Sequence, residues 1–224
     1  YKNYLFLTFT GRNDWVSTLS KENRSFFYPG VSTSFIASDA IQSIKNSNTI
    51  SFAKVYASWN RTGNVTLQPY SLENAYAQSN GFPFGNSVGY LPSLSVTAPG
   101  IQPEFVSSYE AGIQFGLFNN RLNFDGAYVY SDSDGQIFNS TASRATGYNV
   151  KVINAGRLVN NIFELSLNGD IIRSNEVKWN MGVNFTYIKN IVKDLSEGLT
   201  NINNFRQSYA VKGEQYPSLL VSDY

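Results

Sequence analysis

The sequence predicts an all-β fold, an antiparallel transmembrane β-barrel segment of about seven to eight strands. Three observations lead to this prediction. Apolar and polar residues alternate along several runs, the runs are long enough to cross a hydrocarbon layer, and short turns alternate with long loops. A soluble β-sandwich also alternates, but its outward face is rich in Lys, Glu and Thr, whereas the polar positions here are mostly Asn, Gly and Ser.

The clearest alternation lies in Phe105 to Ser131, two runs joined by the turn Phe118-Asn119-Asn120-Arg121. Side chains of a strand point alternately to its two faces. One face of the first run therefore collects Tyr109, Ala111, Ile113, Phe115 and Leu117. Asn tolerates the positive φ that tight turns require, so Asn-Asn predicts a hairpin. The apolar face suits lipid and the polar face suits a water-filled lumen.

The remaining strands are expected on both sides of this hairpin. The first three cover Asn3–Arg12, Phe26–Ala37 and Ser51–Asn60, and the last two include Phe163–Ile171 and Val177–Tyr187. Between the second and third strands, Ile41 and Ile44 suggest one amphipathic turn. Short connections are expected at Phe118–Arg121 and Arg173–Glu176, and long loops at Arg61–Glu104 and Asp132–Ile153. Barrels of bacterial outer membranes have short periplasmic turns and longer extracellular loops.

Composition agrees with a membrane barrel. Charged residues make up 15% of the chain, below the roughly 25% of soluble domains, and aromatic residues also make up 15%. The net charge of +1 gives no indication of a nucleic-acid partner. Cysteine and histidine are absent, which excludes disulfides, thiol chemistry and imidazole base chemistry. The sequence contains no apolar run of about 18 residues that would form a transmembrane helix.

The candidate lumen-lining residues are the polar members of the alternating runs. They are Glu110, Gln114, Asn123, Asp125, Glu164, Asn168, Asp170, Lys178, Asn180 and Asn184. A pair of these carboxylates could do acid–base work, but they lie among amides and hydroxyls without a nucleophile. We therefore expect a hydrated wall and no enzyme activity or cofactor.

One motif resembles the start of a calcium-binding loop. Asp132 and Asp134 precede Gly135, but Gln136 to Ala145 contains no acidic residue to complete the ligand set. We therefore predict a solvated turn and no metal site.

Aromatic residues suggest two further roles. Those near strand ends are expected to anchor at the membrane interface: Trp59, Tyr128, Tyr130, Trp179 and Tyr187. Others lie within the long loop, among Gly, Pro, Asn and Ser: Tyr70, Tyr76, Phe82, Phe84 and Tyr90. A loop of this length is usually functional or disordered. Its rings could contact a substrate or a partner, or pack within the loop.

Several stretches also carry a family resemblance. They are Leu7 to Asp14, Phe26 to Pro29, Ala57 to Asn64, Tyr109 to Gly112 with Phe118 to Leu122, Asn154 to Gly156, Trp179 to Asn190, and Val211 to Pro217. As an ordered set they resemble SusC/RagA-type TonB-dependent outer-membrane transporters of Bacteroidota. Departures from the family pattern occur at Asn160-Asn161-Ile162 and at Ser131 to Gly135.

The resemblance implies a barrel of 22 strands around an N-terminal plug, of which residues 1–224 would supply seven strands and the start of an eighth. It also implies import of oligosaccharides or peptides with a SusD-like surface lipoprotein, driven by TonB through the plug. The chain opens on Tyr1-Lys2-Asn3-Tyr4 without a signal peptide, so we expect an internal piece of a longer outer-membrane protein. Alternative functions are a TonB-dependent siderophore or cobalamin receptor and a soluble β-sandwich adhesin.

Overall fold

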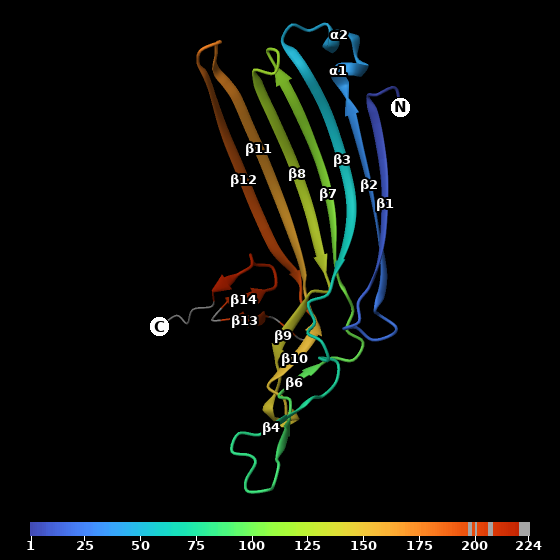
Figure 1. Ribbon diagram of the computed structural model, residues 1–224, viewed down its shortest axis with the longest axis vertical. Helices are drawn as coiled ribbons and strands as arrows, with labels where there is room; N and C mark the ends of the chain where they lie inside the picture. The colour runs from blue at the N-terminus through green and yellow to red at the C-terminus, as the bar shows by residue number, and fades with distance from the viewer. Residues whose placement is uncertain (197–198, 200, 206–207, 220–224) are drawn as a thin grey trace.

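The computed structural model describes residues 1–196, 199, 201–205 and 208–219. Its main feature is one antiparallel sheet of seven long strands, in the order β1-β2-β3-β7-β8-β11-β12 (Figure 1). The strands are β1 (Leu5–Trp15), β2 (Ser25–Ile36), β3 (Ile50–Asn64), β7 (Glu104–Leu117), β8 (Leu122–Asp134), β11 (Arg157–Arg173) and β12 (Lys178–Asp194). This confirms the predicted fold class and the seven expected strands.

The strands extend further toward the long loops than predicted. β3 was expected to end at Asn60, but its residues through Asn64 pair with β7, where Asn64 lies opposite Glu104. β11 and β12 each contain 17 residues. A membrane-spanning strand needs about 9–11 residues, so these strands are long enough to continue beyond the hydrocarbon layer. The strand lengths predicted from alternation were too short, because backbone pairing continues where side chains no longer alternate between apolar and polar.

Short and long connections lie at opposite ends of the sheet (Figure 1). At one end are the two hairpin turns and the connection that holds α1 (Ala37–Ala40) and α2 (Gln42–Lys45), two helical turns where one was expected. In the first hairpin, Phe118, Asn119 and Asn120 have φ values of 54°, 57° and 57°. The left-handed conformation predicted for the asparagines is therefore present, and Phe118 shares it.

The long loops at the other end contain strands of their own. The first holds β4 (Tyr76–Gln78), β5 (Tyr90–Pro92) and β6 (Ser95–Thr97), and the second holds β9 (Ile137–Thr141), the 3-10 turn η1 (Arg144–Thr146) and β10 (Val150–Asn154). β6 pairs in parallel with β10, which pairs with β9. The two loops are thus joined into one three-stranded sheet. The pairing of β6 with β10 escaped prediction because it links segments that are far apart in sequence.

The described residues after β12 add no eighth strand to the main sheet. They form a separate small sheet of β13 (Asn201–Phe205), β14 (Ser208–Val211) and β15 (Ser218–Leu219). Asn190 draws this segment back onto β12, because its amide exchanges hydrogen bonds of 2.6 and 3.2 Å with the backbone of Tyr216. The start of an eighth strand, expected from the resemblance, is therefore not found in the described part of the chain.

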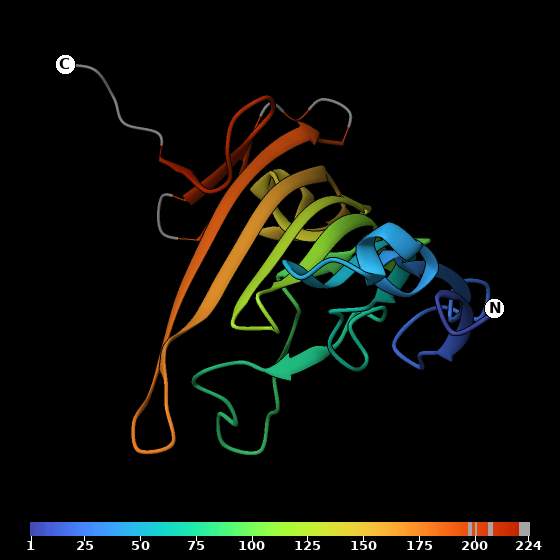
Figure 2. The same cartoon turned by 90° about the horizontal axis from the view of Figure 1, so that it is seen from above.

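The long strands curve as a single layer (Figure 2). Ala53 and Ala127 are buried within the sheet, whereas the two clusters of buried apolar residues lie at its loop end. One cluster includes Leu19, Phe26 and Ile101, and another includes Ala155, Val192 and Leu195. Along the rest of the sheet large apolar side chains are exposed, with Phe9 74% and Phe185 54% accessible. Among the described residues, no helix is long and apolar enough to cross a membrane. Burial of apolar side chains thus stabilises the loop end of the sheet, which we call the rim. Backbone hydrogen bonds between strands hold together the rest of the sheet, which we call the wall.

Candidate functional site: the polar wall and the loop tip

The register of the strands separates the sheet into the two faces that the sequence predicts. Ile113 pairs with Gly126 on β8 and with Val55 on β3, all on the apolar face. Its neighbour Gln114 pairs with Asp125 and with Lys54 on the polar face. Since paired residues of an antiparallel sheet point to the same side, each face is continuous across the strands.

The polar face carries a hollow of about 640 Å³ over β3, β7, β8, β11 and β12. Most of the predicted lumen-lining residues surround it: Glu110, Gln114, Asn123, Asp125, Glu164, Asn168 and Asn184. The structure therefore brings these residues together, although they come from four strands between β7 and β12. Their role in a lumen remains a prediction.

Asp170, Lys178 and Asn180 lie apart from this hollow, at the end of the sheet with the short turns. The side-chain amide of Asn180 donates to an Asp170 carboxylate oxygen at 3.0 Å. Arg173 lies 4.0 Å from the same carboxylate and pairs in register with Lys178. These three predicted residues therefore lie in a small polar group near the short turns and do not line the hollow.

Tyr56 was not among the predicted site residues, yet it lies over the hollow. A Cβ atom built on Gly112 would come within 2.3 Å of the Tyr56 ring, so the ring lies across this glycine. The Lys54 ammonium is 5.4 Å from the centroid of the same ring. Strict alternation from Val55 and Ala57 would have placed Tyr56 on the polar face. Tyr56 was not predicted as a site residue because an aromatic side chain was not expected on the polar face.

The chemistry of the wall is that of hydrogen bonding and charge. The Gln114 amide donates to an Asp125 carboxylate oxygen at 2.6 Å, and the Asn168 amide donates to the Ser166 hydroxyl at 3.0 Å. Glu110, Asp125 and Glu164 line the hollow, whereas Lys54 lies beside it. Such a surface offers acceptors to sugar hydroxyls, to peptide amides and to cations.

The aromatic residues of the first long loop are exposed at its tip. The exposed fractions are 86% for Tyr70, 70% for Tyr76, 42% for Phe82, 80% for Phe84 and 63% for Tyr90. The hairpin of β4 and β5 carries four of them away from the sheet (Figure 1). Phe82, the least exposed of the five, packs its ring against Gly89 of the same loop, whereas the other four rings are open to solvent. Their contact with a substrate or a partner stays a prediction.

The base of that loop, by contrast, is packed on the rim. Val65, Leu67 and Ala98 contact the cluster of Leu19, Phe26 and Ile101. This part of the predicted binding loop is therefore structural, because it carries the apolar residues that close over the strand ends. Only the tip projects from the sheet.

The acidic motif at the end of β8 makes an ion pair. The Arg157 guanidinium binds Asp132 with two hydrogen bonds, one of them 2.8 Å long from Nε to Oδ1. Asp132 and Asp134 lie within β8, where they pair with β7 and β11, so the prediction of a solvated turn is wrong for these two residues. The chain leaves the strand only at Gly135, which has a φ of 66°. Within residues 1–196, 199, 201–205 and 208–219, no group of three or more acidic, histidine or cysteine side chains is placed to hold a metal ion.

Predicted interface aromatics are aligned across the apolar face. Trp59 pairs with Tyr109, and Tyr109 pairs with Tyr130, whose ring centroid is 6.1 Å away. Tyr128 and Tyr187 occupy the next outward positions, where both pair with Phe163, and Trp179 lies near the short turns. Aromatic girdles flank the apolar band of membrane barrels. The positions fit two such girdles, and their contact with lipid remains a prediction.

A curved sheet with one apolar face, one polar face and loops at one end defines the wall of a membrane β-barrel. The chain belongs to the family described as TonB dependent receptor-like, beta-barrel, whose sequence profile matches residues 1–219. This membership confirms the fold inferred from the sequence.

Relatives and solved structures agree with this assignment. The chain is 28% identical over 206 residues to the TonB-dependent receptor SusC of Bacteroides thetaiotaomicron, covering 87% of the chain and 20% of SusC. It is 27% identical over 195 residues to TonB-dependent receptor P26 of Formosa agariphila, covering 87% of the chain and 20% of that protein. These matches confirm the resemblance to SusC-type receptors.

The fold also resembles a part of the RagAB peptide transporter. The TM-score to that structure is 0.85 at 23% identity, over 94% of this chain and 23% of the other. The RagAB peptide importer in its closed-closed state gives a TM-score of 0.84 with the same identity and coverage. The chain thus spans about a fifth of the length of the relatives it matches.

Proposed function

We propose that the chain is one part of the barrel wall of an outer-membrane importer of the SusC type, in a Gram-negative bacterium. In this proposal, residues 1–224 all belong to the barrel domain, and the plug and the remaining strands belong to other parts of the protein. The observation that carries it is the separation of faces, with apolar residues toward lipid and an amide- and acid-lined hollow toward the lumen. Transport, and not catalysis, is the function that such a wall supports.

The substrate class is oligosaccharides or peptides, and a SusD-like surface lipoprotein is the partner. Amides and carboxylates of the wall match the hydroxyls of sugars and the amides of peptides. The family resemblance supports both substrates, and RagAB, whose fold this chain resembles in part, is a peptide importer. Energy would come from TonB through the plug. No observation favours the siderophore or cobalamin receptor, and the single exposed apolar sheet does not fit a soluble adhesin.

The exposed loop tip would serve the lipoprotein or the incoming substrate. Its rings project on the side of the long loops, which we assign to the extracellular space. Aromatic residues are enriched at protein interfaces, and sugar rings stack on aromatic faces. A rigid base and an exposed tip are suited to this role, because loops on a fixed scaffold carry binding residues without loss of fold stability.

The test is to replace residues 76–92 by a short Gly/Ser linker in the full-length transporter. Ser93 donates a backbone hydrogen bond of 2.9 Å to Ala75, so the linker joins ends that are already adjacent. A change in loop length alters closure free energy by only about 0.6 kcal/mol per doubling. We expect a folded barrel by heat-modifiable gel mobility, with uptake or lipoprotein binding lost.

A matched pair of variants tests whether the function depends on the aromatic side chains or only on the presence of the loop. Serine at Tyr76, Phe82, Phe84 and Tyr90 should reproduce the loss, whereas serine at Asn80 and Asn86 should not. Lipoprotein binding measured without substrate then distinguishes contact with the lipoprotein from substrate capture. Normal uptake and normal lipoprotein binding in the linker variant would show that the tip has neither role.

A further inference from the structure

The two long loops together line a pocket of about 540 Å³, formed mainly by residues 66–75 of the first loop and by β6, β9 and β10 (Figure 1). Leu67, Ile137 and Val152 supply its apolar part. Hydroxyl and amide side chains and the ring of Tyr70 supply much of the rest. Sites for small ligands have volumes of about 300–1,000 Å³ and combine apolar surface with a few polar groups, as this pocket does.

Hydrogen bonds hold the frame of this pocket in place. The Thr97 hydroxyl donates to the backbone oxygen of Ser71 at 2.7 Å, which ties the first loop to β6. One carboxylate oxygen of Glu104 accepts from the Thr66 hydroxyl at 3.3 Å and from the Ile137 N–H at 2.7 Å, which joins the first loop to the second. A site with fixed walls loses little conformational freedom when it binds a ligand.

Tyr70 lines the pocket in an unusual backbone conformation. Its φ is 63°, in the left-handed region that bulky residues rarely adopt, and the residue is 86% exposed. The backbone N–H groups of Ser71 and Glu73 donate to the oxygens of Gln68 and Tyr70, both at 3.2 Å, and hold this turn. Backbone outliers of this kind occur at binding sites, where the surrounding structure maintains them.

The polar groups of the pocket suit an uncharged ligand. Within the described part of the chain, the side chains of Gln68 and Glu73 have no hydrogen-bond or ion-pair partner, so both are available. None of the described residues that line the pocket is cationic, so the carboxylate of an acidic sugar or of a peptide C-terminus would lack a partner. Sugar hydroxyls both donate and accept hydrogen bonds, and the Tyr70 ring offers a flat apolar surface beside these groups.

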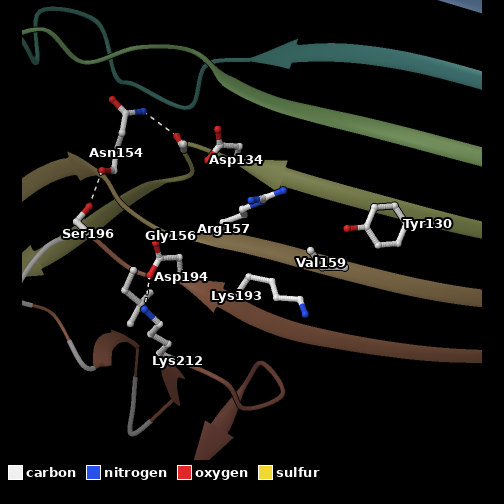
Figure 3. Close-up of a pocket in the computed structure, with 12 residues that line it drawn as sticks. Tyr130, Asp134, Asn154, Gly156, Arg157, Val159, Lys193, Asp194, Ser196 and Lys212 are labelled. Carbon is white, nitrogen blue, oxygen red and sulfur yellow. Dashed lines mark hydrogen bonds and ion pairs between the residues drawn. The ribbon is translucent and has the colours of Figure 1, made fainter.

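A second pocket at the loop end, of about 660 Å³, has a different character (Figure 3). The Lys212 ammonium lies 2.7 Å from an Asp194 oxygen, and Arg157 binds Asp132. Because its cations and carboxylates offset one another, this second pocket does not indicate a class of ligand.

We propose that the pocket between the two long loops binds a neutral oligosaccharide. Tyr70 would stack on a sugar ring, and Gln68 and Glu73 would form hydrogen bonds with its hydroxyls. The proposal rests on the proposed function for the extracellular position of the loops, and it names the substrate class that is bound there. All described lining residues lie outside residues 76–92, so this site is separate from the loop tip.

The test uses the purified full-length transporter in a detergent without a sugar headgroup, applied to an array of immobilised ligands. The array carries neutral oligosaccharides of hexoses and pentoses, the same chains with uronic acids, and peptides of similar length. We expect retention on at least one neutral oligosaccharide, and weaker retention on its acidic counterpart and on the peptides. Equal retention on the acidic sugars, preferential retention on peptides, or no retention would overturn the proposal.

Variants at Tyr70 then assign the binding to this pocket. Tyr70→Asn removes the ring but keeps a residue that tolerates a positive φ, and it should weaken binding of the retained oligosaccharide about tenfold. Tyr70→Phe keeps the ring and should bind like the parent. Trp15→Ala is the matched control, because Trp15 is 72% exposed and does not line the pocket. Heat-modifiable gel mobility checks that each barrel is folded. Unchanged binding in Tyr70→Asn would place the sugar elsewhere and overturn the proposal.

The linker variant that lacks residues 76–92 separates this site from the role of the tip. It keeps all described lining residues, so it should still bind the sugar when uptake or lipoprotein binding is lost. Loss of sugar binding in this folded variant would contradict a site confined to the pocket. Absence of sugar binding in a parent transporter with normal uptake would overturn the sugar site and leave the import proposal standing.

Discussion

The residue that best separates the two faces is Ile113, together with its neighbour Gln114. Ile113 is 39% exposed among apolar side chains, whereas Gln114 hydrogen-bonds to Asp125 on the polar face. An arginine that points into lipid costs about 2–4 kcal/mol near the bilayer midplane, and one that points into a lumen meets water. Ile113→Arg should therefore destabilise the barrel by this amount, and Gln114→Arg should be tolerated.

The two arginine variants should be compared by folding into lipid vesicles, with the full-length transporter and a urea titration read by gel mobility. They carry the same new charge one residue apart, so each controls for the other. Equal losses of stability, or a larger loss for Gln114→Arg, would mean that the faces are assigned the wrong way round.

Some residues of the polar face could be predicted from the sequence, and others could not. The polar positions from Glu110 to Asn184 could be predicted because alternation alone decides the face of a strand residue. Tyr56 could not be assigned a role, because its place over the hollow depends on Gly112 in the neighbouring strand. The register between two strands decides which residue of the neighbouring strand a side chain covers. The sequence of a single strand does not reveal this register.

At the scale of elements, Asn154 holds the two long loops to the rim. Its amide nitrogen donates to the carbonyl oxygens of Gln102, at 2.9 Å, and Gly135, at 2.7 Å. Its side-chain oxygen accepts from the backbone N–H of Gln102 at 2.8 Å. This residue begins one of the stretches that carry the family resemblance. The sequence showed the motif but not its structural role.

Asn154→Ala should loosen the loops while leaving the wall intact. These hydrogen bonds are exposed or part-buried, so water can replace the lost partner in part, and each bond contributes about 0.5–1.5 kcal/mol. Hydrogen–deuterium exchange should become faster in residues 98–103 and 135–156 and stay unchanged in β7 and β8. Asn139→Ala, at an exposed position of β9, is the control. Equal exchange in both variants would show that the loops are held by other contacts.

At the scale of the whole molecule, the described sheet is open. β1 and β12 are its edge strands, and each pairs on one side only among the described residues. Exposed edges of this length invite pairing with further strands. We therefore predict that neighbouring strands of the complete protein close the barrel at both edges. The sequence indicated this through the resemblance, since alternation within a strand does not report the number of strands in a barrel.

The orientation of the wall underlies the proposed function, because binding of the surface lipoprotein and of substrate at the loop tip both require the long loops to lie outside. Single cysteines at Asn80, in the loop tip, and at Asn175, in the turn between β11 and β12, report the two ends. The chain has no cysteine of its own, although the rest of the transporter must also be made cysteine-free.

Intact cells should be treated with a membrane-impermeant maleimide, and labelling should be compared with that after the outer membrane is permeabilised. The account predicts labelling at Asn80 in intact cells, and labelling at Asn175 only after permeabilisation. Labelling at Asn175 but not at Asn80 in intact cells would contradict the orientation on which the proposed function rests.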